Sequence, residues 1–170
     1  YNTAEDVNIG VEDIEHVFTE TTNVVGVAKM HGGSGNPSPY TARGVYRGME
    51  AAAVKVFGER SLKDKTVSLQ GAGSVGRFLG ELLYESGAKV FVTDINETNI
   101  EKFKSLVPNA EVVGIDDIYD VDADIYAPCA LGATVNDKTI DRLKCKIVCG
   151  AANNQLAEWR HGDILKEKNI

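Results

Sequence analysis

Apolar residues follow two different spacings along the second part of this chain. Short apolar runs, typical of buried strands, alternate with segments whose apolar residues recur every three or four positions, which is typical of amphipathic helices. The predicted strands cover residues 66–70, 89–93, 111–113, 124–127 and 146–149. The predicted helices cover 74–86, a segment that Asn96 caps and that ends before Pro108, and a segment that Asn136 caps with Ile140 and Leu143 on its apolar face. This alternation predicts an α/β fold, a Rossmann-like doubly wound parallel sheet with helices on both faces.

The first part of the chain does not follow this alternation. Apolar residues at helical spacing between Val11 and Phe18 predict one helix, and the glycine-rich stretch 31–36 predicts a hinge. Ser38 followed by Pro39 is typical of a helix start, with a hydroxyl cap and a proline in the first turn. We therefore expect residues 1–36 to be the tail of a preceding domain with its hinge, and residues 37–170 to form the α/β domain.

The sharpest feature is a glycine-rich turn between a predicted strand and a predicted helix, formed by Gly71, Ala72, Gly73, Ser74, Val75 and Gly76. Gly71 would permit a tight turn, Gly73 would let the backbone approach a pyrophosphate, and Gly76 would let the helix pack closely on the strand. The helix start would offer unpaired N–H groups and its positive dipole end to the phosphates. A glycine pattern alone is weak evidence, but this context favours a dinucleotide site over a purely structural turn.

An acidic residue at the end of the next predicted strand strengthens this interpretation. Asp94 lies 23 residues after Gly71, close to the spacing of about 20 that is typical of a ribose-binding acid. Its carboxylate would accept hydrogen bonds from the ribose hydroxyls and would repel a 2′-phosphate. Neither Ile95 nor Asn96 offers a cation there. The sequence therefore predicts NAD, rather than its phosphorylated form, as the cofactor.

Two runs of small residues, 128–133 and 150–155, follow later predicted strands. In an open parallel sheet the ligand lies outside the carboxyl ends of the strands, so these runs would let a flat ring or a ribose lie against the backbone. Asn153 would hydrogen-bond a ribose, a carboxamide or a substrate, or else would cap a turn. Cys129 has no base near it in the sequence, and its apolar neighbours favour a small buried side chain over a nucleophile.

Composition and charge restrict the class of protein and of partner. Hydrophobic residues make up 43% and charged residues 25% of the 170, which is ordinary for one soluble globular domain. The net charge of -7 disfavours a nucleic-acid partner. No apolar run approaches the ~20 residues of a membrane helix, and no charged start leads into a secretory signal, so we expect neither.

Cysteine and histidine usage restricts the redox compartment and the metal chemistry. An odd number of cysteines without paired spacing argues against a disulfide framework and favours a reducing cytoplasm. The histidines show no metal-ligand spacing, so we expect no bound metal and place all three at the surface or in linkers: His16, His31 and His161.

Four motifs in register resemble the family of glutamate, leucine, phenylalanine and valine dehydrogenases. They are SPYTARGVY (38–46), TDIN (93–96), APCALGA (127–133) and GAANNQ (150–155). The resemblance covers essentially the whole chain. It implies that residues 1–36 are the C-terminal tail of a substrate domain with its hinge, and that 37–170 are an NAD-binding domain truncated at its C-terminus. The family's active-site lysines lie upstream of this segment, so we expect the 170 residues alone to be inactive.

The same resemblance assigns roles to individual positions. The segment YNTAEDV (1–7) matches the stretch that carries the family's catalytic acid/base, which would be Asp6. Thr41 matches a threonine that contacts the nicotinamide carboxamide, and Asn153 would also reach toward the substrate. Together with the turn already described, the predicted cofactor-binding residues are Thr41, Gly71, Ala72, Gly73, Ser74, Val75, Gly76, Asp94, Ile95, Cys129, Ala130, Ala151, Ala152 and Asn153.

The resemblance implies oxidative deamination of an apolar L-amino acid, with leucine favoured, to its 2-oxo acid and ammonium, with hydride transfer to NAD. It further implies a cytoplasmic homo-oligomer whose partner is the amino acid substrate, with no nucleic acid and no membrane. Phenylalanine- or valine-type specificity stays open, because the pocket-lining residues fall mostly outside this chain. A non-catalytic NAD-binding sensor domain is the alternative of another class. Asp6, Thr41 and Asn153 together favour the enzyme, since a sensor needs none of them.

Overall fold

The computed structural model describes residues 1–6 and 9–170, which form two compact units, Tyr1–Tyr40 and Thr41–Ile170. Val7, the last residue of the predicted catalytic segment, lies outside the described residues. The assignment of residues 1–36 to a substrate domain and of 37–170 to a cofactor domain stays a prediction.

The first unit is organised around helix α1 (Val11–Glu20) and the 3-10 helix η1 (Lys29–His31). The Glu15 carboxylate accepts a hydrogen bond from the Ala28 N–H at 2.7 Å and also pairs with the exposed His31 side chain. The Ala28 bond, followed by the contact with His31, lowers the pKa of Glu15. One carboxylate therefore ties η1, and the start of the glycine-rich stretch after it, to α1.

The second unit contains the predicted parallel sheet with helices on both faces, which confirms the fold class. Its strands are β1 (Thr66–Gln70), β2 (Lys89–Thr93), β3 (Glu111–Val112), β4 (Ile125–Pro128) and β5 (Ile147–Val148). Its helices are α2 (Ser38–Phe57), which begins at the end of the first unit, α3 (Ser74–Glu85), α4 (Glu97–Leu106), η2 (Asp117–Tyr119) and α5 (Arg160–Glu167).

The strands are ordered β3-β2-β1-β4-β5, and each neighbouring pair is parallel. Leu69 of β1 aligns with Val92 of β2 on one side and with Ala127 of β4 on the other. The chain therefore builds outward from β1 in one direction, through β2 and β3, and then resumes beside β1 in the other direction. Such a reversal is the topological switch point of a doubly wound sheet.

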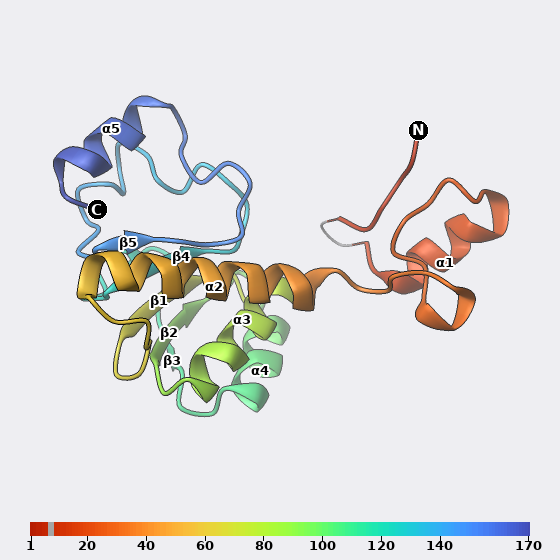
Figure 1. Cartoon of the computed structure of the whole chain (residues 1–170), viewed down its shortest axis with the longest axis horizontal. Coiled ribbons are helices and arrows are strands. Elements are labelled where there is room, and N and C mark those ends of the chain that lie inside the picture. Colours follow the sequence, from red (N-terminus) through yellow and green to blue (C-terminus); the bar gives the residue numbers. More distant parts are fainter. Residues whose placement is uncertain (7–8) are drawn as a thin grey trace. The chain divides into compact units, whose positions relative to one another are not determined.

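Alternate residues of the strands supply two separate cores, one on each face of the sheet. Val67 and Leu69 pack with α2, α3 and α4 in the first core, while Tyr126 packs with η2 and α5 in the second. Figure 1 shows α2, α3 and α4 gathered along one face, and α5 with its neighbouring loops over the other. The sheet is thus covered on both sides, which leaves the strand ends as the places where ligands can reach it.

Local patterns predict the elements near the glycine-rich turn closely. The strands 66–70 and 89–93 are confirmed residue for residue, and α3 ends one residue before the predicted position. Asn96 caps α4 as predicted, because its side-chain oxygen accepts a hydrogen bond from the Thr98 N–H at 3.0 Å. Strands β3 and β5 are shorter than predicted, and β4 has the predicted length but begins and ends one residue later.

The helix predicted after Asn136 is wrong, because residues 136–142 form hydrogen-bonded turns instead. The Thr139 hydroxyl accepts a hydrogen bond from the Asn136 N–H and donates one to the Thr134 carbonyl oxygen. Such local side-chain bonds compete with the helical ladder. Ile140 and Leu143 are nevertheless buried in the second core, so their apolar pattern reports burial rather than a helix.

The placement of His161 at the surface or in a linker is also wrong. It lies on α5, a helix that the apolar pattern did not indicate, and it is 1% exposed. Its Nδ1 accepts a hydrogen bond from the Glu158 N–H at 3.0 Å, and its Nε2 lies 3.1 Å from a carboxylate oxygen of Asp137. Because both ring nitrogens have partners, the imidazole can be buried at little cost.

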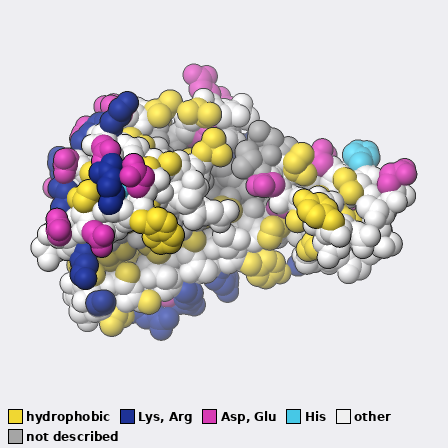
Figure 2. Space-filling model, turned by 90° about the horizontal axis from the view of Figure 1, so that it is seen from above, with side chains coloured by type: hydrophobic (Ala, Val, Ile, Leu, Met, Phe, Trp, Pro, Cys, Tyr) yellow, Lys and Arg dark blue, Asp and Glu magenta, His cyan; other side chains and the backbone are white. Residues whose placement is uncertain are grey.

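The surface carries charges of both signs. On the face shown in Figure 2, Lys and Arg side chains are interspersed with Asp and Glu side chains over one end of the second unit. Within residues 1–6 and 9–170, no helix has the length and apolar character that crossing a membrane requires.

Candidate cofactor site

The carboxyl ends of the parallel strands carry most of the residues predicted to bind a cofactor. The glycine-rich turn follows β1, Asp94 follows β2, and the two runs of small residues follow β4 and β5. In open α/β sheets, ligands bind in the crevice at the switch point, which here lies between β1 and β4. The fold therefore brings four segments that are distant in the sequence to one edge of the sheet.

The glycine-rich turn is packed tightly on one side and open on the other. Gly71 has a φ of +102°, and a Cβ there would lie 2.8 Å from the carbonyl oxygen of Cys129. A Cβ at Gly76 would lie 1.9 Å from the carbonyl oxygen of Gly71. A Cβ at Gly73, by contrast, would meet no atom within 4 Å. Open space beside the Gly73 backbone is what the close approach of a pyrophosphate requires.

Helix α3 starts directly from this turn. Gly73 is its N-cap residue, and its first turn carries no acidic side chain. The first N–H groups of a helix lack partners within the helix, and the helix dipole adds positive potential there. The end of α3 beside the open Gly73 backbone therefore has the electrostatics of an anion site.

Asp94 is held in place by backbone groups on both sides. Its Oδ2 accepts a hydrogen bond from the Ala72 N–H at 2.7 Å, and its Oδ1 accepts one from the Asn96 N–H at 2.8 Å. The Asn99 side-chain nitrogen lies 3.4 Å from both carboxylate oxygens. An ionised carboxylate has about four acceptor sites, and the two short backbone bonds use two of them, so further donors to the half-buried Asp94 compete only with the long contacts from Asn99. Ile95, the next residue, is largely exposed.

The loops after β4 and β5 contact each other through their backbones. A Cβ at Gly150 would lie 2.2 Å from the Pro128 carbonyl oxygen, and that oxygen also accepts a hydrogen bond from the Ala152 N–H at 2.9 Å. The Ala133 N–H donates to the Asn154 carbonyl oxygen at 2.6 Å. Asn153 lies exposed between these contacts. Asn153 therefore lies on a loop that is fixed by backbone contacts with the end of β4 and with the loop after it.

Cys129 has the environment of a packing residue. Burial raises the pKa of its thiol to about 11, so the thiolate is scarce at neutral pH. Its N–H donates to the Gln70 carbonyl oxygen at 2.7 Å, and its backbone lies against Gly71. These contacts leave the thiol without the chemistry of a nucleophile, and the place of Cys129 in the lining of the cofactor site stays a prediction.

A buried polar network under the turn was not predicted from the sequence. Gln70, the last residue of β1, donates from its side-chain nitrogen to the Tyr119 hydroxyl at 2.8 Å and accepts from the Tyr126 hydroxyl. Burial raises the pKa of Tyr126, so this hydroxyl stays protonated as a donor. The available signal was a glutamine at the end of an otherwise apolar strand, directly before Gly71.

The other predicted site residues are dispersed. Thr41 lies exposed in the first turns of α2, and Ala130 lies exposed after β4. Ala151, which follows β5, is half-buried. Asp6 lies in the other compact unit, where its side chain is exposed and its carbonyl oxygen accepts the Ile9 N–H at 2.9 Å. Its catalytic role, like the roles of the cofactor-lining residues, stays a prediction.

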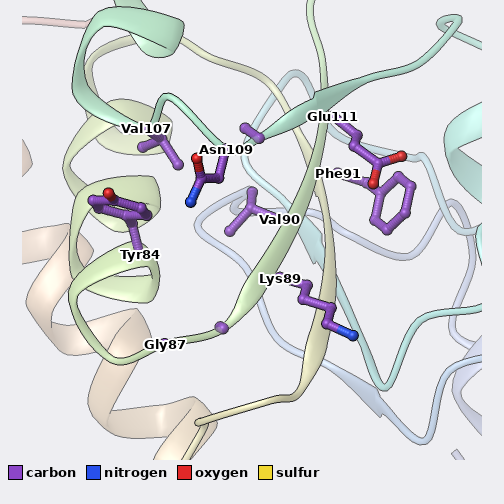
Figure 3. A pocket seen from close by; sticks show the side chains of 10 residues that line it. Tyr84, Gly87, Lys89, Val90, Phe91, Val107, Asn109 and Glu111 are labelled. Atoms are coloured by element: carbon purple, nitrogen blue, oxygen red, sulfur yellow. The ribbon is translucent and has the colours of Figure 1, made fainter.

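A separate pocket of about 250 Å³ lies at the opposite edge of the sheet. Figure 3 shows it at the start of β2, lined by Tyr84, Val90, Val107 and Asn109 among others. These residues belong to the amino ends of β2 and β3 and to the helix ends beside them, so the pocket lies apart from the glycine-rich turn. Among the described residues, no three His, Cys, Asp or Glu side chains are grouped so that they could hold a metal ion.

Taken together, the sheet order, the turn and Asp94 define the second unit as a Rossmann-like domain of the nucleotide-binding kind. Residues 32–98 match the family model of Glutamate/Leucine/Phenylalanine/Valine dehydrogenase. Over essentially its whole length, the chain is similar in sequence and structure to amino acid dehydrogenases.

Individual relatives give the extent of the similarity. A leucine dehydrogenase of Thermoactinomyces intermedius is 55% identical over 170 residues, which is all of this chain and 46% of the relative. A phenylalanine dehydrogenase of Lysinibacillus sphaericus is 42% identical over 174 residues, again 46% of its length. The crystal structure of L-tryptophan dehydrogenase from Nostoc punctiforme superposes with a TM-score of 0.79 and 38% identity over 99% of this chain and 47% of that one. The chain spans about half the length of each.

Proposed function

We propose that this chain is the cofactor-binding part of an NAD-dependent dehydrogenase that deaminates an apolar L-amino acid, leucine in the first place, to its 2-oxo acid and ammonium. The observation that carries the proposal is the 55% identity to a leucine dehydrogenase over all 170 residues. The anion-attracting turn and the oriented Asp94 carboxylate support it independently, because they suit a dinucleotide.

In this proposal most of the chain's site residues bind and orient the cofactor, and one of them transfers protons. The N–H groups at the start of α3, beside the open Gly73 backbone, hold the pyrophosphate. Asp94 accepts from the ribose, and Asn153 and Thr41 orient the nicotinamide end. When bound, NAD would supply the acceptor for the hydride that leaves the substrate α-carbon. The Asp6 carboxylate takes and returns protons while the substrate imine forms, water adds to it and ammonium leaves. The enzyme works as a cytoplasmic homo-oligomer.

Turnover by the whole enzyme tests the reaction. We expect L-leucine to drive NAD reduction with a kcat/KM at least about tenfold above that of L-phenylalanine, because a pocket shaped for one side chain discriminates by roughly 1–3 kcal/mol per methylene-sized misfit. The measurement is absorbance at the NADH band with each amino acid in turn, L-valine included. A preference for phenylalanine or valine would change the proposed substrate but leave the proposed reaction in place. No turnover with any amino acid, together with intact NADH binding, would favour the sensor alternative.

Cofactor preference tests the role of Asp94. We expect the chain to bind NADH at least about tenfold more tightly than NADPH, because a 2′-phosphate would stand against an oriented carboxylate and neither Ile95 nor Asn96 supplies a cation. Titration that follows the fluorescence of each reduced cofactor gives both Kd values. Equal or tighter binding of NADPH would remove Asp94 from the ribose site.

A further inference from the structure

The amide of Ala72 is a backbone donor with a single side-chain partner. Ala72 is fully buried, and its N–H donates to Asp94 Oδ2 at 2.7 Å. A buried N–H without an acceptor is costly, so this bond contributes to the conformation of the turn. The neighbouring Gly71 N–H donates to the Thr93 carbonyl oxygen at 2.8 Å. Two consecutive amides of the glycine-rich turn are thus tied to the end of β2.

The carboxylate that makes this bond is itself fixed from the other side. The Asn96 N–H donates to Asp94 Oδ1 at 2.8 Å, and Asn99 lies beside both oxygens at the start of α4. Asp94 is therefore oriented by the fold alone, with one oxygen aimed at the turn.

We propose that Asp94 is a positioning residue of the phosphate-binding turn as well as its ribose acceptor. By holding the Ala72 N–H, it keeps the turn in the conformation that binds a diphosphate, so phosphate and ribose recognition depend on the same side chain. This inference rests on the proposed function, since it concerns the same nucleotide site.

Two ligands distinguish the binding of the ribose by Asp94 from its positioning of the turn. ADP carries both the diphosphate and the ribose hydroxyls, whereas 2′,3′-dideoxy-ADP carries the diphosphate alone. If Asp94 acts only on the hydroxyls, the wild type and Asp94→Ala bind dideoxy-ADP equally well. If Asp94 also positions the turn, Asp94→Ala binds dideoxy-ADP about tenfold more weakly than the wild type does, because a typical hydrogen bond contributes up to about a factor of ten. Calorimetric titration of the chain with each ligand gives the four Kd values.

Two further variants test whether the loss of dideoxy-ADP affinity comes from the Ala72–Asp94 bond rather than from a general loss of stability. Asp124 is a matched control, because its Oδ2 accepts the Thr66 N–H at 2.8 Å at the other end of β1. We expect Asp124→Ala to lower the thermal stability but to leave the Kd for dideoxy-ADP within about twofold. Asp94→Asn keeps an oxygen that can accept the Ala72 N–H, so it should regain most of the dideoxy-ADP affinity that Asp94→Ala loses.

Hydrogen exchange provides a readout that does not require a ligand. We expect the Ala72 amide to exchange at least about tenfold faster in Asp94→Ala, while the Gly71 amide changes less. If Asp94→Ala does not fold, Asp94→Ser takes its place, since its hydroxyl is too short to span the same gap. Unchanged dideoxy-ADP binding and unchanged Ala72 exchange would overturn the positioning role. A wild type that binds neither ADP nor NADH would contradict the proposed function alone, and the exchange result would still decide whether Asp94 holds the turn.

Discussion

Asp6→Asn is expected to lower the turnover of the whole enzyme by roughly 10²–10⁴-fold, while the Kd for NADH stays within about twofold of the wild-type value. An amide of the same shape can still accept a hydrogen bond, but it cannot take up and release a proton near neutral pH. Asp6 belongs to the first compact unit, whereas the glycine-rich turn and Asp94 belong to the second. Steady-state kinetics and a cofactor titration on the same preparation measure the two effects.

The competing interpretation is that the Asp6 side chain only caps or solvates its local turn and takes no part in proton transfer. Under that interpretation Asp6→Asn would keep turnover within a few-fold of the wild type and would lose some stability. Glu12→Gln is a suitable control, because Glu12 is an exposed acid of the same unit at the start of α1. If both variants reduce turnover equally, the catalytic assignment of Asp6 should be withdrawn.

Gly76→Ala is expected to destabilise the chain by about 1–3 kcal/mol and to raise the Kd for NADH more than about tenfold. The new Cβ would lie 1.9 Å from the Gly71 carbonyl oxygen and 3.4 Å from a Leu69 methyl carbon, so the start of α3 must move away from the turn. Thermal unfolding and a fluorescence titration measure the two losses. For a chain of this length, the stability loss corresponds to roughly 2–12 °C in Tm.

The same Gly→Ala change at Gly44 should stabilise the chain instead of destabilising it. Gly44 lies inside α2, is exposed, and would place a Cβ where no atom lies within 4 Å. Gly44→Ala should therefore stabilise the chain by about 0.5–1 kcal/mol through helix propensity and leave the Kd for NADH unchanged. If Gly76→Ala binds NADH as tightly as Gly44→Ala does, the close approach of α3 to the turn is not needed for the cofactor.

The sequence predicts best where a few neighbouring residues decide the outcome. The turn from Gly71 to Gly76, the strands around it and the Asn96 cap all depend on local rules, and each lies where it was expected. Prediction failed where contacts between residues that are distant in the sequence determine the structure. Burial of His161 depends on Asp137, 24 positions away, and the Ala72–Asp94 bond joins the ends of two strands 22 positions apart. Neither pairing has a periodic signal in the sequence.

The failed helix after Asn136 has a different cause. Its apolar residues were identified correctly as buried, but the Thr139 hydroxyl bonds to the Asn136 N–H and to the Thr134 carbonyl oxygen and so competes with a continuous helical ladder. Helical spacing over a single turn cannot distinguish a helix from a series of turns that bury the same two side chains. The assignment of Asp6, in turn, came from a resemblance alone, since nothing about an exposed acid near a chain's start indicates proton transfer.

The bond between Ala72 and Asp94 constrains how cofactor preference can evolve in this chain. A lineage that moves toward the phosphorylated cofactor has to remove the negative charge at position 94, and any replacement without a side-chain acceptor of the same reach also deprives a buried amide of its partner. An intermediate with such a replacement would be less fit for either cofactor until a second site supplied a neutral acceptor for that amide. The order of mutations is therefore restricted, because Asn, which is neutral and keeps the acceptor, is the accessible first step, while other replacements need a compensating change. Laboratory selection for NADPH use should recover Asp94→Asn, or paired substitutions at the end of β2 and in the turn, more often than other single changes at Asp94.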